Sequence, residues 1–424
     1  HYLFCLLKNT RKTKTLTDGY HKSAIYSGSI YLIQLHIEGE VEEIRGKICS
    51  IEYINRIRDN LLNVKMETLL PLYEDLRSAD CIVCGGSGRS LHSLNIAMSQ
   101  MATMKDFKVV ITPDDPGFPG KDMYDAAPKL EKKYEKILLL INSGSGESED
   151  PKTLAEDLAR YVKDTSSQKF KMGLITSNLD SSISQIVQRY GHVVNLTGRI
   201  KEGPSEEYTE TGIMGDIFEL GSLSLLQMMS EAVFQNRSVE RVHEMLEEEF
   251  PVLGSMIDSN VDSEAYDFCV DLLERHGDVF LGGKGTANEV IKMTAIRLFH
   301  IKRFLGDNIY IARGVNTPRP RAGDLEILVS YSGETRPLVT WCNIFKSLGG
   351  IVFSIIGNRG SLLDKISDRK IVLEERVKPG QPRRFYMRTA YLLSPLPVKL
   401  AERLSEKGLQ LPEYILNWYH SVIE

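Results

Sequence analysis

The chain has 424 residues, enough for two domains that each bury a full hydrophobic core. Hydrophobic residues make up 42% and charged residues 26%, the balance of a soluble globular protein, and with a net charge of −5 nothing global suggests the basic footprint of a nucleic-acid binder. No apolar run approaches the roughly 18 residues of a membrane span, so no membrane partner is expected. The 6 cysteines lack framework spacing, which favours a reducing, cytoplasmic location.

The start of the chain differs from a signal peptide. Apolar residues 2–7 precede the basic ones, whereas a signal peptide places its positive charges first. We therefore expect residues 1–49 to form an N-terminal extension of undetermined order.

Helices and buried strands are predicted to alternate from residue 50 to residue 234. Apolar residues at helical spacing predict the helices, and short apolar runs predict the strands. In chain order we expect helices at 51–63 and 66–77, a strand at 81–84, a helix at 91–104, a strand at 107–111, a helix within 112–135, a strand at 137–141, a helix to residue 160, strands at 172–176 and 193–196 around a helix, and an apolar helix at 213–234.

The same alternation restarts after residue 236. We expect helices at 239–250 and 264–275 and strands at 279–281, 309–311, 325–329, 351–355 and 371–373, again with helical stretches between strands. Alternating strands and helices predict parallel sheets. The fold class is therefore α/β, with two tandem doubly wound parallel-sheet domains of the flavodoxin-like kind, at 50–236 and 237–424.

A small polar loop follows the strand at 137–141. It contains Ser143, Gly144, Ser145 and Ser148, and a helix follows it. A buried strand, a polar loop and a helix start aim free backbone N–H groups and hydroxyls at one spot, which suits a phosphate. An ordinary strand-to-helix turn would use the same small residues for their backbone freedom.

A second copy of this loop favours the phosphate interpretation. Ser330, Ser332 and Thr335 follow the strand at 325–329, so the pattern Ser-x-Ser-Gly-Glu-Ser/Thr occurs twice at corresponding places. An internal repeat of this kind sets the architecture of the chain. In parallel sheets, ligands bind beyond the carboxyl ends of the strands, where both loops are expected.

A glycine-rich turn follows the first predicted strand of each half. The first turn comprises Gly86, Ser87, Gly88, Arg89 and Ser90, and the second includes Gly283, Gly285 and Thr286. The GxGxxG spacing of a dinucleotide site is absent, so a tight turn beside a sugar or phosphate fits better. The arginine would pair with an anion, although a loop arginine is more often a solvated charge, and the second turn has none.

Two residues stand out as a candidate base and its assistant. Glu219 lies near the start of the very apolar helix at 213–234, where desolvation would raise its pKa towards that of a useful base. A first-turn glutamate is also favoured by the helix dipole alone. His300 lies near the end of a predicted helix, where a structural or dipole-pairing role is the common alternative.

Both halves resemble the sugar isomerase (SIS) domain, which binds phosphosugars. The resemblance covers about residues 50–424 and rests on the two glycine turns, the two Ser-Gly-Glu loops and the segment 215–220. The second half most resembles 3-hexulose-6-phosphate isomerase, and the tandem layout resembles the isomerase part of glucosamine-6-phosphate synthase. Members of this type use a histidine after the glycine turn and a glutamate at the start of the last helix.

The resemblance implies that each half keeps one member of this pair. His300 matches the histidine, but Ala102 stands at that place in the first half; Glu219 matches the glutamate, but Met387 stands there in the second. Since SIS domains pair and share residues between partners, we expect an internal pseudo-dimer. One composite site would combine the first-half loops with Glu219 as base and His300 as assistant, and the opposite site would be vestigial or regulatory.

The implied chemistry is aldose–ketose or ketose–ketose isomerisation of a sugar 6-phosphate through a cis-enediolate. It requires no cofactor, and no cluster of histidine, cysteine and carboxylate residues with metal-ligand spacing appears. Two alternatives remain: a non-catalytic phosphosugar-binding regulator, and an aminosugar-phosphate isomerase or deaminase. The expected partners are a sugar phosphate and further copies of the chain, as a homodimer or other homo-oligomer.

Overall fold

The computed structural model describes residues 46–104, 106–198, 216–312, 314–412 and 415. Residues Ile48–Glu424 cluster as one compact unit, within which both halves lie. The predicted N-terminal extension, apart from its last few residues, lies outside the described part of the chain. The boundary predicted between residues 236 and 237 stays a prediction.

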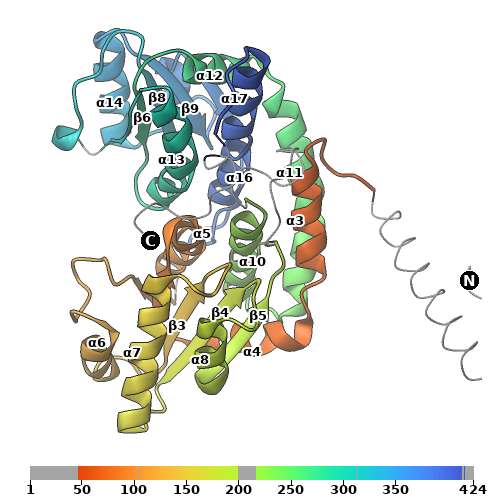
Figure 1. The fold of residues 1–424 in the computed structure, drawn as a ribbon, viewed down its shortest axis with the longest axis vertical. Helices are drawn as coiled ribbons and strands as arrows, with labels where there is room; N and C mark the ends of the chain where they lie inside the picture. Colours follow the sequence, from red (N-terminus) through yellow and green to blue (C-terminus); the bar gives the residue numbers. More distant parts are fainter. Residues whose placement is uncertain (1–45, 105, 199–215, 313, 413–414, 416–424) are drawn as a thin grey trace, which may run out of the picture. The chain divides into compact units, whose positions relative to one another are not determined.

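The first half is built on a parallel sheet of five strands, in the order β2-β1-β3-β4-β5 (Figure 1). The strands are β1 (Cys81–Gly86), β2 (Val109–Ile111), β3 (Ile137–Asn142), β4 (Phe170–Thr176) and β5 (Gly191–Asn195). The helices around it are α3 (Glu52–Leu62), α4 (Met66–Ser78), α5 (Gly88–Met98), α6 (Met123–Glu131), α7 (Glu149–Thr165), α8 (Ser182–Tyr190) and α10 (Asp216–Phe234), with a short 3-10 turn, η1 (Ser99–Thr103), after α5. Strands β1 and β3 are buried along their whole length, as expected of a parallel sheet covered on both faces.

The second half repeats this sheet, in the order β10-β9-β8-β6-β7. Its strands are β6 (Val279–Gly282), β7 (Ile309–Ile311), β8 (Leu325–Ser330), β9 (Ile351–Ile356) and β10 (Arg369–Val372). Its helices are α11 (Glu240–Val261), α12 (Glu264–Glu274), α13 (Thr286–Phe304), α14 (Arg336–Ser347), α15 (Leu362–Ile366), α16 (Arg384–Leu393) and α17 (Pro395–Glu406), with a short turn η2 (Gly314–Asn316) between β7 and β8.

Both sheets have the flavodoxin-like strand order, second-first-third-fourth-fifth. The predicted fold class is thereby confirmed. In each sheet the order reverses between the first and third strands, and ligands of such folds bind at this reversal. The glycine turns follow β1 and β6, and the Ser-rich loops follow β3 and β8, so all four segments lie at the two reversal points.

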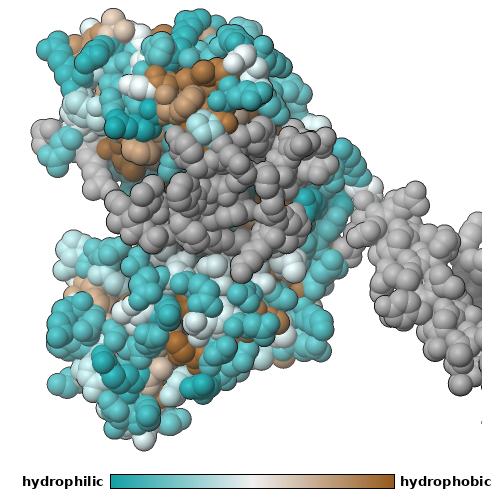
Figure 2. Space-filling model, viewed as in Figure 1, coloured by the Kyte–Doolittle hydropathy of each residue, from teal (hydrophilic) through white to brown (hydrophobic). Residues whose placement is uncertain are grey.

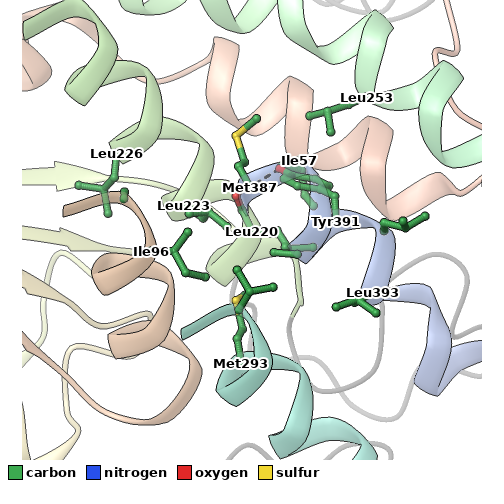
Figure 3. Close-up of a cluster of buried hydrophobic side chains, with 14 of the residues drawn as sticks. Ile57, Ile96, Leu220, Leu223, Leu226, Leu253, Met293, Met387, Tyr391 and Leu393 are labelled. Carbon is green, nitrogen blue, oxygen red and sulfur yellow. Dashed lines mark hydrogen bonds between the residues drawn. The ribbon is translucent and has the colours of Figure 1, made fainter. Parts of the chain in front are cut away.

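Helices from both halves share one hydrophobic core. Helices α5 and α13, which follow the first strand of each sheet, pack directly against each other. Figure 3 shows Ile96 of α5, Leu220 of α10, Met293 of α13 and Met387 of α16 in one cluster of buried hydrophobic side chains. All four side chains are fully or almost fully buried. The two halves therefore meet through equivalent helices, the arrangement expected of a pseudo-dimer.

Three elements differ from the prediction. Helix α5 ends at Met98, and η1 takes up the rest of the predicted helix to residue 104. Helix α11 continues through Pro251 to Val261, because the buried stripe of Phe250, Leu253 and Ile257 continues past the proline. Among its described residues, the segment between β7 and β8 contains only η2, whereas α6 lies at the corresponding place in the first half.

Helix α10 is the one helix in the described residues that is long and apolar enough to cross a membrane. Of its most apolar window, 89% is buried inside the protein, which is the environment of a core helix.

The face seen in Figure 2 is largely hydrophilic, with scattered apolar patches. Phe299 and Phe304 of α13 are among the exposed large apolar side chains.

Candidate functional site

The two Ser-rich loops have the same backbone geometry. Gly146 and Gly333 have φ angles of +65° and +64°, a region that favours glycine. A Cβ on either glycine would collide with the hydroxyl of Ser181 or Ser361, respectively. The hydroxyl of Ser143 accepts a hydrogen bond from the N–H of Gly146 (3.2 Å), which fixes the tight turn.

The second loop repeats this turn and its neighbouring contacts. Ser330 Oγ accepts from the N–H of Gly333 at 3.1 Å. Ser145 Oγ accepts from its loop's glutamate N–H at 3.3 Å, and Ser332 Oγ does the same at 3.1 Å. The two copies of the sequence motif thus form equivalent hydrogen bonds, and these bonds shape each loop from within.

The glutamate of each loop has a structural role. Glu147 accepts a hydrogen bond from the N–H of Ser182 at 2.7 Å, and Glu334 accepts from the N–H of Leu362 at 2.8 Å. These N–H groups belong to the first turns of α8 and α15, so each carboxylate satisfies a helix N-terminus. The hydrogen bonds from Ser182 lower the pKa of Glu147. The glutamate of each motif therefore joins its Ser-rich loop to the start of the helix that follows the next strand.

The glycine turns also match between the halves. Gly88 and Gly285 have φ angles of +53° and +59°. A Cβ on Gly86 would lie 3.0 Å from the carbonyl oxygen of Asn142, and one on Gly283 would lie 2.6 Å from the carbonyl oxygen of Ala287. Close approach of the backbone requires Gly86 and Gly283, and the positive φ angle favours glycine at Gly88 and Gly285.

The side chain of Arg89 is turned towards a carboxylate of the protein itself. Arg89 is 7% exposed and forms an ion pair with Asp216, the first residue of α10, which is 1% exposed. Nε of Arg297 on α13 lies 3.7 Å from the same carboxylate. Asp216 thus ties the glycine turn and α10 of the first half to α13 of the second.

Asn142 forms a second junction, which the sequence analysis did not single out. Its side-chain nitrogen donates to the carbonyl of Ser90 and to the hydroxyls of Ser93 and Ser222, all within 2.8–2.9 Å. These partners lie on α5 and α10, so the end of β3 fixes both helices around the first loop. Val329 stands at the corresponding end of β8, so the second half lacks this junction.

Glu219 and His300 each lie one helical turn beyond the residues of the Asp216–Arg297 contact. Glu219 is 8% exposed, and its Oε2 has no hydrogen-bond partner among the described residues. His300 is half-buried, and burial, reinforced by the positive charge of Arg297, lowers its pKa. A lowered pKa keeps this imidazole neutral near pH 7, able to accept or donate a proton.

The other predicted residues of the first site lie around the same edge. Ser87 and Ser145 are partly exposed, Ser90 and Ser143 are buried, and Ser148 is the N-cap residue of α7. Met387 is the fourth residue of α16, as Glu219 is of α10, and it is fully buried. The roles assigned to Glu219 and His300 stay predictions.

A cavity of about 180 Å³ lies at the second Ser-rich loop. It is lined by the hydroxyl residues Ser330, Ser332 and Thr335 and by two cationic side chains, Lys284 and Arg383. Lysine and arginine beside several hydroxyls make a site for an anion such as phosphate. Sequence reasoning missed both cations: Lys284 lies in a turn noted only for having no arginine, and Arg383 reaches the loop only through the fold.

In the described ranges, no group of three or more histidine, cysteine or acidic side chains is placed to hold a metal ion.

The fold and the arrangement of the two halves are similar to those of solved phosphosugar enzymes. The C-terminal domain of glucosamine-fructose-6-phosphate aminotransferase from Francisella tularensis aligns with 82% of this chain and 93% of its own length, at a TM-score of 0.51 and 12% identity. Tagatose-6-phosphate ketose/aldose isomerase from Escherichia coli aligns with 85% of this chain and 94% of its own, at a TM-score of 0.53 and 12% identity. These likenesses establish a shared fold.

Among curated proteins, the chain is similar to 3-hexulose-6-phosphate isomerases. It is 32% identical to the enzyme of Bacillus subtilis over 123 residues and 29% identical to that of Mycobacterium gastri over 115 residues. These matches span 29% and 27% of this chain and 62% and 56% of the relatives. No protein-family model matches the sequence. The resemblance predicted from the motifs is thereby confirmed.

Proposed function

We propose that the protein is a phosphosugar isomerase that interconverts aldose and ketose, or two ketose, forms of a sugar 6-phosphate. The Ser-rich loop and glycine turn of the first half would hold the phosphate and the sugar hydroxyls. Binding of the phosphate, far from the reacting carbons, would supply the binding energy that positions the substrate.

In this mechanism Glu219 is the base. It removes the proton from the carbon next to the carbonyl, which gives a cis-enediolate, and returns the proton to the neighbouring carbon. Its buried position and its Oε2 without a hydrogen-bond partner among the described residues support this role. Neutral His300 moves a proton between the two oxygens of the enediolate or assists ring opening, so protons balance over the cycle.

The observation that carries the proposal is the shared carboxylate of Asp216. Its contacts with Arg89 and Arg297 tie the helices of Glu219 and His300, which come from opposite halves, to the first glycine turn. A composite site requires such a connection, and neither half has an equivalent of both residues by itself.

The test is turnover of hexose, hexulose and aminohexose 6-phosphates by the wild type and by Glu219→Gln. Product formed by the wild type and lost in the variant supports the isomerase and names the substrate; release of ammonia would identify the aminosugar alternative. The matched control is Met387→Leu, at the equivalent position of α16, which should retain activity. Equal turnover by wild type and Glu219→Gln would remove Glu219 from the mechanism.

The second candidate is a phosphosugar-binding regulator without turnover. The cavity at the second loop favours it, because Lys284 and Arg383 supply charge for an anion while Met387 supplies no base. Thermal stabilisation by a sugar phosphate without product would establish this alternative.

A further inference from the structure

A second cavity, of about 440 Å³, lies between the second sheet and helix α14. Phe280 of β6 and Trp341 and Phe345 of α14 form its apolar walls, and Pro318 closes another side. In the first half, α6 occupies the connection between the second and third strands and packs on α7. The described residues of this connection in the second half form only η2, and the cavity lies at the corresponding place. Its volume is within the ~300–1,000 Å³ usual for small-molecule sites.

One carboxyl group lines this apolar cavity. Glu326 of β8 is 2% exposed, and its Oε2 has no hydrogen-bond partner in the described part of the chain. Burial raises the pKa of this carboxyl to about 8. Glu326 pairs with Phe280 across the sheet, as Leu139 pairs with Val83 in the first half. The first half thus has leucine at this position, and the second half has an unpaired acid.

We propose that this cavity binds a small organic ammonium ion with an apolar body, with Glu326 as its counter-ion. Aromatic rings attract cations, and Trp341 already does so: Nζ of Lys284 lies 4.9 Å from its ring centre. The rings of Phe280 and Phe345 would contact the apolar body. The cavity shares no lining residue with the one at the second Ser-rich loop, although Lys284 of that loop's cavity lies against Trp341, and the proposal does not depend on the proposed function.

The buried carboxyl of Glu326, rather than the sum of the surrounding charges, favours a cation over an anion. Glu326 and Arg319 are the charged residues among those that line the cavity. The titratable groups on the packed elements include Tyr310 of β7, Cys342 and Lys346 of α14, Lys284 over the Trp341 ring, and Asp368, which pairs with Lys346. Burial, reinforced by Glu326, raises the pKa of Cys342 to about 12, so its thiol stays neutral. An ammonium ion would compensate the buried carboxylate, whereas an anion would add a like charge beside it.

The experiment uses the full chain and the fluorescence of Trp341. The chain has 2 tryptophans, so Trp418→Phe leaves Trp341 as the reporter. The probe is 2-phenylethylamine, and its uncharged counterpart is 2-phenylethanol. We expect saturable quenching by the amine at pH 8.5 and affinity about 20-fold lower at pH 6.5, where Glu326 takes up a proton. The alcohol should bind at least tenfold more weakly at pH 8.5.

Glu326→Gln should weaken amine binding at least tenfold and remove the pH dependence of binding. If the Glu326→Gln protein does not fold, the second variant is Glu326→Leu, which introduces the residue found at the corresponding position of the first half. Glu264→Gln, which removes a carboxylate on α12 outside the cavity, is the matched control and should bind like the wild type. Absence of saturable amine binding, equal affinity for the alcohol, or unchanged binding by both Glu326 variants would overturn the proposal.

Discussion

Nδ1 of His92 on α5 lies 2.9 Å from Oε2 of Glu289 on α13, so a polar contact joins the two equivalent helices of the two halves. Lys292 and Asn95 also donate to the Glu289 carboxylate. Burial alone would raise the pKa of Glu289, but hydrogen bonds from His92 and Lys292 and the charges of both residues outweigh it and hold the pKa at about 2.

Glu289→Gln should therefore destabilise the protein, on the order of 1–2 kcal/mol after allowance for solvent screening. A carboxyl whose pKa is lowered on folding stabilises the fold above its unfolded pKa, here 4.5, and loses this effect as the pH falls towards 2. Urea unfolding of both proteins at pH 7 and pH 3.5 measures the difference. A difference that does not shrink at the lower pH would exclude this ion-pair role.

Gly146→Ala and Gly333→Ala form a matched pair that tests the two Ser-rich loops separately. Each adds a Cβ at a positive φ angle against a helix-capping serine, so each should cost about 1–3 kcal/mol and distort its own loop. If the first loop holds the substrate, Gly146→Ala should abolish turnover and Gly333→Ala should largely spare it. The reverse result would place the reaction in the second half.

Asp216→Asn should be strongly destabilising, by about 3 kcal/mol or more. The amide removes the negative charge that Arg89 and Arg297 share in a buried setting. The double variant Arg89→Met with Asp216→Asn should recover part of the loss, because it removes one of the uncompensated cations. Additive losses in this cycle of denaturation measurements would mean that the ion pair contributes no coupling.

The pH dependence of turnover should report His300. Since burial and Arg297 lower its pKa below the usual 6.5, kcat/KM should not fall on account of this residue until the pH is below 6.5. The wild-type profile and the His300→Gln profile, measured on the substrate that the panel identifies, should differ by the loss of one acid limb. If the wild type and His300→Gln have the same pH profile, the fall in kcat/KM at low pH belongs to another group.

Glu326→Gln should stabilise the protein at neutral pH, on the order of 2–3 kcal/mol. The folded pKa of about 8 exceeds the unfolded value of 4.5, so the protonated carboxyl favours folding and this effect fades as the pH rises from 4.5 to 8. The gain in Tm over the wild type should thus be larger at pH 8 than at pH 5. A variant that is less stable than the wild type at pH 8 would indicate a partner for the carboxylate.

The fold could be predicted from local patterns because strand runs, glycine turns and Ser-rich loops are contiguous in the sequence. The strand order then follows from topology rules. Local patterns could not predict that α5 ends at Met98 or that α11 continues through Pro251, because tertiary packing decides both.

The site was predicted less completely, because its contacts join distant residues. Arg89 and Asp216 were both in motifs that carried the resemblance, but nothing in either motif indicates that they pair. The same holds for Lys284 and Arg383, which meet only where β6 and the segment before α16 reach one edge of the sheet. Which charged residues from distant parts of the sequence line the same cavity becomes known only from the three-dimensional structure.

Because α5 and α13 pack against each other within a single chain, their contact does not depend on protein concentration. Two separate SIS-like subunits would dissociate as their concentration falls, and a shared site would then be lost. Here the partner is covalently attached, so its effective concentration is set by the connecting chain and stays fixed however dilute the solution. On the proposed function, turnover per molecule should therefore remain constant down to low protein concentrations.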